Sequence, residues 1–244
     1  MIQTNEEIQI KLLRIHDLLD KQEVDGLLLG RVSTFAWATC GAESYVNTAA
    51  TEGAASLLIT RKHRYLLTNS IEAPRMEQEF GLADRGWEFV VSPWTDPQKE
   101  LDKLVTGVSL AGDIAFPGAK DVSSEVARLR SNLTETEGER FRQLGQLCAG
   151  VMESTLQTVC PGMSEYQIAA AVSNESLDRG VQPIVNLIAT DERVYNFRHP
   201  LPTDKKLEKY AMLVLCGRKW GLVCSITRLI HFGPAPNELK ERIG

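Results

Sequence analysis

The chain has 244 residues, with 27 basic and 32 acidic side chains and a formal charge of −5. This length predicts two compact domains, because one domain usually takes about 100–200 residues. Acidic and basic residues are interspersed without a Lys/Arg run, which excludes nucleic acid and anionic membrane surfaces as partners, since both demand a basic face. No stretch is apolar enough for a signal peptide or a membrane span, so we expect a cytoplasmic protein.

The cysteines are few and odd in number. They stand at positions 40, 148, 160, 216 and 224, without a CxxC pair. This pattern favours reduced thiols over a disulfide framework. Cys216 and Cys224 are close enough in sequence to face each other across a hairpin, and the favoured interpretation is two ordinary buried cysteines.

The first half of the chain has the pattern of a mixed α/β sandwich. Residues 5–21 place apolar side chains at helical spacing, and Leu27-Leu28-Leu29 reads as a strand buried on both faces. The further elements predicted in this half are a hairpin of strands 54–60 and 64–68, a helix from a Ser70 cap to about Phe80, a strand at 87–91, a helix starting at Asp96-Pro97, a last strand at 108–114 and a helix around 120–131. We expect this first domain to span residues 1–132.

The second half opens with a capping box, in which Thr134 and Glu137 have the required spacing. Apolar residues then repeat at steps of three and four from Phe141 to Val159, which predicts a one-sided helix of about six turns. Ser164 and Gln167 form a second capping box, opening a helix that stops at Gly180. The last predicted elements are a strand at 184–188 and a hairpin of strands 212–216 and 222–227 around the turn 217–221.

Several short motifs follow one another in a fixed order along the chain. They are Val24-Asp25-Gly26-Leu27-Leu28-Leu29, Leu66-Leu67-Thr68, Leu133-Thr134-Glu135, Pro161-Gly162-Met163-Ser164-Glu165, His199-Pro200-Leu201-Pro202 and Ile226-Thr227-Arg228. In this order they resemble the family of creatinase, prolidase and Xaa-Pro aminopeptidase. The resemblance implies an α/β chain, with a creatinase-like mixed-sheet domain at 1–132 and the first half of a pita-bread domain at 133–244.

The same resemblance implies a metal site that this chain does not complete. Peptidases of the family bind two divalent metals such as Mn, Co or Zn through two Asp on the hairpin, and through a His and two Glu further along. The resemblance places the two Asp positions at Leu215 and Ser225. Leucine cannot bind a cation and neutral serine is a poor ligand, so we expect no metal cofactor in this chain.

The other three metal ligands of the family would fall beyond Gly244. Residues 236–242 resemble the first turn of a helix that the family continues. Half of a pita-bread domain would leave one sheet edge exposed, which proteins usually cover. We therefore expect a fragment, a truncated product or a chain that needs a partner.

Two residues carry the functional roles that the resemblance implies. His199 matches the family's substrate-contacting histidine, which metal-free creatinase uses as a proton shuttle, and a loop histidine between prolines is the alternative. Arg228 matches an arginine that hydrogen-bonds to carboxylates beside the metals, and is assigned here to substrate binding. His231 matches no ligand position and is expected at the surface.

Three functions remain open from the sequence. The first is a family-type hydrolase acting on dipeptides or proline-containing N-termini, which the loss of metal ligands disfavours. The second is a metal-independent, creatinase-like hydrolase of a small C–N substrate, in which His199 acts. The third is a pseudoenzyme that keeps the fold for binding or assembly, and the chain fits this hypothesis best. The family further implies a homodimer.

Overall fold

The computed structural model describes residues 2–234, with side chains described from residue 6 onward. The chain divides into two compact units, residues 1–139 and 140–244. The domain boundary predicted at residues 132 and 133 stays a prediction, and the helical turn predicted at 236–242 lies outside the described residues. None of the described helices combines the length and apolarity needed to cross a membrane.

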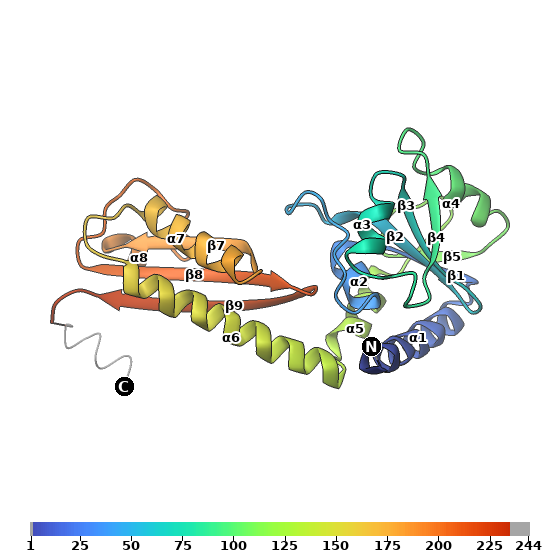
Figure 1. Cartoon of the computed structure of the whole chain (residues 1–244), viewed down its shortest axis with the longest axis horizontal. Coiled ribbons are helices and arrows are strands. Elements are labelled where there is room, and N and C mark those ends of the chain that lie inside the picture. The colour runs from blue at the N-terminus through green and yellow to red at the C-terminus, as the bar shows by residue number, and fades with distance from the viewer. Residues whose placement is uncertain (1, 235–244) are drawn as a thin grey trace. The chain divides into compact units, whose positions relative to one another are not determined.

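The first unit is built around a six-stranded mixed sheet with the strand order β4-β3-β2-β1-β5-β6 (Figure 1). Strand β2 runs antiparallel to both β1 and β3, whereas β5 runs parallel to β1, and β4 runs parallel to β3. Its strands are β1 (Gly26–Arg31), β2 (Glu52–Thr60), β3 (Arg64–Asn69), β4 (Glu88–Ser92), β5 (Leu110–Gly112) and β6 (Lys120–Asp121), and its helices are α1 (Ile2–Gln22), α2 (Val32–Ala38), α3 (Ala73–Gln78), α4 (Lys99–Leu104) and α5 (Ser123–Ser131).

Apolar side chains cover both faces of this sheet. Leu27 and Leu29 of β1 belong to one core cluster with helices α1, α2 and α5. Leu28, which points to the opposite face, belongs to a second cluster with Leu101 of α4. All three leucines are fully buried. The continuous apolar run of β1 therefore has the physical cause that the sequence predicts, namely burial on both sides of the sheet.

Three details of the first unit differ from prediction. Ser70 does not cap α3, because Asn69 Oδ1 accepts hydrogen bonds from the backbone N–H groups of Ile71 and Glu72 and the helix starts only at Ala73. Helix α4 starts at Lys99, so Pro97 precedes it. Strand β5 is not the last strand, since the two residues of β6 pair with it in parallel. Helix α2 is not among the elements that the sequence predicts.

Lys11 on α1 is fully buried in the first unit. Its ammonium group lies 2.6 Å from Glu7 Oε1, 2.9 Å from Glu137 Oε1 and 2.6 Å from the carbonyl oxygen of Trp37. Both glutamates are also buried. Glu137 completes the predicted capping box, since its Oε2 accepts from the Thr134 N–H while its own N–H donates to Thr134 Oγ1. Lys11 thus fixes α1 to the first turn of helix α6 (Glu135–Thr158), which contains Glu137.

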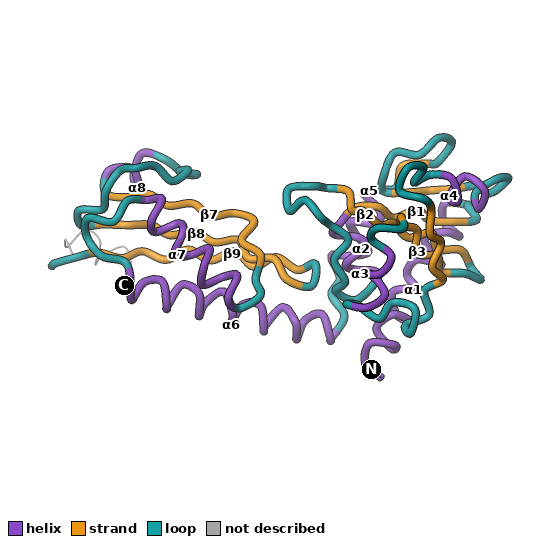
Figure 2. Tube along the Cα trace, turned by 45° about the horizontal axis from the view of Figure 1, so that its top comes forward, coloured by secondary structure: helices purple, strands orange, loops and turns teal. Residues whose placement is uncertain are grey.

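The second unit is a three-stranded antiparallel sheet with α6 and α7 on one face (Figure 2). Its further elements are α7 (Glu165–Asp178), β7 (Gln182–Thr190), α8 (Glu192–Asn196), β8 (Tyr210–Lys219) and β9 (Leu222–His231). The second capping box is present, with Ser164 and Gln167 bonded reciprocally. The predicted one-sided pattern of α6 is confirmed from Leu144 onward, whereas Phe141 is 41% exposed.

The hairpin of β8 and β9 turns more tightly than predicted. Only Trp220 and Gly221 form the turn, and both have positive φ, at 55° and 74°. Two successive residues with positive φ are the requirement of a type I′ turn, whose twist matches that of the flanking strands. The strands consequently continue to Lys219 and resume at Leu222, so the turn has two residues where five were predicted.

Candidate functional site

The two faces of the β8–β9 hairpin have different environments. On β8, Leu213 and Leu215 face the helices and are fully buried, while Cys216 points to the opposite face and is half-buried. Cys216 pairs directly with Ser225, and the Cys216 Sγ lies 3.1 Å from the Ser225 Oγ. The face away from α6 and α7, which we call the open face, therefore presents a thiol beside a hydroxyl.

This register changes one part of the sequence interpretation. The resemblance assigns Leu215 and Ser225 to the two Asp positions, yet Leu215 pairs with Ile226 and lies in the helix-covered core. Because side chains alternate between faces along a strand, Leu215 and Ser225 point in opposite directions. The structure does not bring the two predicted positions together, and Cys216 is the residue that shares the open face with Ser225.

The open face of the hairpin offers neutral side chains at the paired positions Cys216 and Ser225. Hard cations such as Mn²⁺ are held by carboxylate oxygens, whereas Cys216 and Ser225 offer a thiol and a neutral hydroxyl. Within residues 2–234 no three His, Cys, Asp or Glu side chains gather in a group that could hold a metal ion. The hairpin of residues 210–231 contains no Asp or Glu.

The loop that carries His199 is anchored by a buried carboxylate. Glu165, at the first turn of α7, is completely buried. Its Oε1 accepts hydrogen bonds from the backbone and hydroxyl of Thr190 and pairs with Arg193 Nε at 3.0 Å. Its Oε2 accepts from the backbone and hydroxyl of Thr203. Arg193 also donates to the carbonyl of Leu201 at 2.9 Å, so one carboxylate holds both ends of the segment around His199.

Asp191 joins the start of the same loop to the start of β8. Its carboxylate accepts hydrogen bonds of 2.9 Å from the backbone N–H groups of Glu208, Lys209 and Tyr210, where β8 begins. Burial raises the pKa of Asp191, but these three donors outweigh burial and the pKa lies below its ordinary value. Asp191 itself has φ 50° and ψ −121°, outside the left-handed helical region, a backbone conformation that glycine adopts most readily.

His199 itself is exposed on this anchored loop. Three large apolar side chains of the same segment are also exposed: Tyr195 at 68%, Phe197 at 48% and Leu201 at 71%. The imidazole makes no hydrogen bond to another residue of the described chain. The segment thus combines an anchored backbone with an exposed imidazole and exposed apolar side chains.

Arg228 and His231 lie on β9. Arg228 pairs with Leu213, is exposed, and donates a hydrogen bond to the carbonyl of Thr227. No hydrogen bond or ion pair of the described residues joins Arg228 to His199. His231 is partly exposed and lies opposite Tyr210, with their ring centroids 6.1 Å apart. The substrate-binding role of Arg228 stays a prediction.

The sequence interpretation missed the two residues that position this loop. Glu165 appears in it only as part of a family-like motif, and Asp191 does not appear at all. Either residue alone looks like an ordinary surface acid, because the burial of Glu165 and the convergence of three N–H groups on Asp191 depend on segments about 10–40 residues away in sequence. A local sequence pattern has no signal for such long-range donors.

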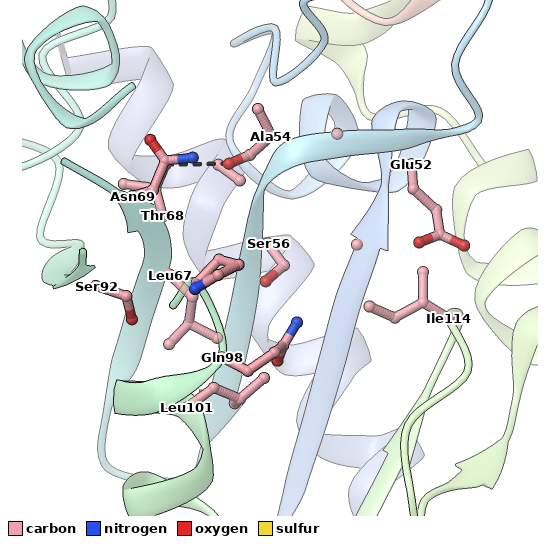
Figure 3. A pocket seen from close by; sticks show the side chains of 14 residues that line it. Glu52, Ala54, Ser56, Leu67, Thr68, Asn69, Ser92, Gln98, Leu101 and Ile114 are labelled. Atoms are coloured by element: carbon pink, nitrogen blue, oxygen red, sulfur yellow. Dashed lines mark hydrogen bonds between the residues drawn. The ribbon is translucent and has the colours of Figure 1, made fainter. Parts of the chain in front are cut away.

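A cavity of about 240 Å³ lies in the first unit beside β2 and β3. Figure 3 shows Ser56, Thr68 and Asn69 around it. Two polar groups of its lining already serve the fold: Thr68 Oγ1 donates to the Ala54 carbonyl, and Asn69 Oδ1 accepts from the turn before α3. Its one ionisable residue is Glu52. We assign no chemistry to this cavity.

Comparison with known proteins identifies the fold. Residues 139–243 match the model of metallopeptidase family M24. The Xaa-Pro dipeptidase from Bacillus anthracis superimposes with a TM-score of 0.74 at 20% identity, over 96% of this chain and 68% of that protein. The prolidase from Pyrococcus horikoshii OT3 gives 0.74 at 19% identity, over 95% and 67%. Among curated proteins, no sequence match was found.

A structure with a different description shares the fold. The N-terminal domain of FACT complex subunit SPT16 from Cicer arietinum (chickpea) superimposes with a TM-score of 0.66 at 12% identity, over 92% of this chain and 66% of that chain. Identities of this size establish architecture alone. The predicted fold class is confirmed: the chain has the pita-bread fold of metallopeptidase family M24, as a mixed-sheet N-terminal domain followed by part of the pita-bread domain.

Proposed function

We propose that this chain is a homologue of the Xaa-Pro aminopeptidases and prolidases that has no metallopeptidase activity by itself. The observation that supports this proposal is the pairing of Cys216 with Ser225 on the open face of the hairpin. A thiol and a hydroxyl there supply no fixed negative charge. Two adjacent divalent cations would repel each other strongly unless carboxylates compensated their charge.

The proposal is tested by metal binding and peptide cleavage on the same preparation. The purified chain is incubated separately with Mn²⁺, Co²⁺ and Zn²⁺, freed of excess ion, and assayed for metal per chain and for cleavage of Xaa-Pro and Xaa-Pro-Xaa peptides. We expect substoichiometric metal and no cleavage above the rate without protein. Stoichiometric metal together with turnover would overturn the proposal.

A matched set of variants tests the cause. The double variant Cys216→Asp/Ser225→Asp restores two carboxylates on one face, and we expect it to bind Mn²⁺ at least about tenfold more tightly than the unchanged chain, measured by titration calorimetry. Each single variant adds one carboxylate and serves as the control, and its affinity for Mn²⁺ should rise by less than that of the double variant. Equal affinity of the double variant and the unchanged chain would contradict the proposal that missing carboxylates on the open face prevent metal binding.

The second candidate function is non-catalytic binding or assembly. The exposure of Tyr195, Phe197 and Leu201 on an anchored loop favours it, because contiguous apolar surface is characteristic of interaction sites. The similarity to a subunit of the FACT complex also supports it. Light scattering of the unchanged chain and of a Phe197→Ser/Leu201→Ser variant tests self-association: a dimer that this variant dissociates would support it, whereas a monomer in both would remove a homodimer as the partner.

A creatinase-like hydrolase that uses His199 is the remaining alternative, and the exposed imidazole favours it. The assay measures hydrolysis of creatine and related small C–N compounds without added metal. Turnover that falls at least about 100-fold in His199→Asn would support this alternative, since general acid–base catalysis contributes about 10²–10⁴-fold. Absence of turnover in the unchanged chain would reject it for this chain.

A further inference from the structure

Gly217 on β8 marks a point where a helix thiol approaches the sheet. A methyl group added at Gly217 would lie 2.7 Å from the sulfur of Cys148 on α6 and 2.6 Å from Cγ1 of Val181. Both distances are far below an ordinary contact. The sulfur of Cys148 therefore occupies the space that a side chain at position 217 would take.

Cys224 lies directly opposite Gly217 in the hairpin. Its side chain packs against the same core cluster that contains Cys148, so the two thiols share the helix-covered face. Cβ positions of directly opposed residues in antiparallel strands are about 4.5–5.5 Å apart. The Cys148 sulfur lies 2.7 Å from the Cβ position that Gly217 leaves empty, and the Cys148 and Cys224 side chains are in hydrogen-bonding contact. Cys148 is fully buried and Cys224 is partly exposed.

The sequence favours Cys216 and Cys224 as two ordinary buried cysteines, with a facing pair of thiols as the alternative. The register pairs Cys216 with Ser225 and puts the two cysteines on opposite faces, and both are partly exposed. The thiol adjacent to Cys224 comes from α6 instead. All five cysteines are free in the structure.

We propose that Cys148 and Cys224 form a dithiol modification site, which small-molecule disulfides oxidise reversibly to an internal disulfide between α6 and β9. The reduced form is the resting state of this proposal, because such bonds are usually transient where thiols are kept reduced. This inference is independent of the proposed function, because neither thiol belongs to the open face.

The exchange proceeds in two balanced steps. The partly exposed Cys224 thiolate attacks one sulfur of the small disulfide, forming a mixed disulfide and releasing one small thiolate. Cys148 then loses its proton to that thiolate and attacks the Cys224 sulfur, which releases the second small thiol. In total two protein thiols are oxidised and one small disulfide is reduced to two thiols. A small thiol in excess reverses both steps.

The environment of Cys148 makes the second step the slower one. Burial, followed by the neighbouring Cys224 thiol, raises the pKa of Cys148 to about 12. Thiolate is the attacking species, so little Cys148 is reactive at neutral pH. We expect the mixed disulfide at Cys224 to accumulate first and to convert later into the internal bond.

The test uses the full chain carrying Cys160→Ser, because Cys148 and Cys160 would otherwise share one tryptic peptide. Trypsin separates the peptides of Cys216 and Cys224 at Arg218. The protein is incubated with oxidised glutathione, quenched with an alkylating reagent, digested and followed by mass spectrometry. We expect a cross-linked peptide that joins Cys148 to Cys224 and that dithiothreitol removes. The amount of this peptide should stay the same when Cys216→Ser is added to the chain.

Two further variants keep the test decisive. Cys148→Ser should stop the reaction at the mixed disulfide of Cys224, and Cys224→Ser should leave Cys148 unmodified until the protein is unfolded. Circular dichroism shows whether each variant is folded. The result from one folded variant is enough to test the proposal. A cross-link between Cys216 and Cys224, or a persistent mixed disulfide at Cys224 with Cys148 still free, would overturn the proposal.

Discussion

The two sheets of this chain differ in how their faces are covered. In the first unit, consecutive residues Leu27, Leu28 and Leu29 enter core clusters on both faces of the sheet. In the second unit, the described core lies on the face of α6 and α7, where Leu213 and Leu215 are buried. Cys216 and Ser225 occupy the other face and are at least partly exposed.

This difference shows where each unit tolerates chemical change. A strand that is buried on both faces has to be apolar at every position. A strand covered on one face leaves alternate positions free for polar or reactive groups, and that is where the fold places candidate site residues. Substitutions that move a charge from one face to the other test the comparison most directly.

The largest effect is expected for Leu215→Asp. It puts an unpaired carboxylate into the helix-covered core, and we expect a loss of about 5 kcal/mol in the free energy of unfolding, or no folded second unit at all. Cys216→Asp, one residue away on the open face, should cost less than about 1 kcal/mol. Urea denaturation followed by circular dichroism measures both. Equal losses would mean that the two faces do not differ.

The buried ion cluster of the first unit should give the next largest effect. Lys11→Ala removes the ammonium group that both buried carboxylates, Glu7 and Glu137, contact, so we expect a loss of about 3–5 kcal/mol in the free energy of unfolding. Tryptophan fluorescence during denaturation reports it, since Trp37 lies beside Lys11. Lys21→Ala, at an exposed position of the same helix, is the control and should change the stability by less than about 0.5 kcal/mol.

In the second unit, Glu165→Gln should loosen the loop that carries His199. The amide nitrogen of Gln would face donors that now converge on a carboxylate, and we expect a loss of about 1–3 kcal/mol. Amide hydrogen exchange should rise within residues 191–203. Glu175→Gln removes only a partly exposed ion pair on the same helix and should leave that exchange unchanged. Unchanged protection in Glu165→Gln would show that the carboxylate does not anchor the loop.

The smallest effect is expected at Asp191. Asp191→Ala should cost about 1 kcal/mol, because three N–H groups lose their acceptor, while Asp191→Asn keeps one acceptor and the positive φ and should cost less. The lowered folded-state pKa stabilises the fold above the unfolded value of about 3.9, and this contribution is lost as the pH falls through the folded value. Thermal unfolding of the unchanged chain and of Asp191→Asn, from neutral pH downward, measures this contribution, and the loss of stability on the acid side should be smaller in Asp191→Asn.

Local signals explain which parts of the fold could be predicted. Both capping boxes, the one-sided pattern of α6 and the apolar run of β1 depend on residues within a few positions of one another. Ser70 and Pro97 were wrong as helix starts because neighbouring polar groups and turns compete for the same backbone donors. The turn at Trp220 and Gly221 was placed too broadly, because glycine marks a turn without fixing its length.

The sequence by itself determined the order of the elements, the family resemblance and the absence of Asp at the hairpin positions. The tertiary structure alone decided that Ser225 faces Cys216 and not Leu215, that Glu165 is buried under the His199 loop, and that Cys148 lies beside Cys224. The reason is strand register: a shift by one residue moves every side chain to the other face. Register is set by the two-residue turn, which is local, and by packing against α6, which brings together residues far apart in sequence such as Cys148 and Gly217.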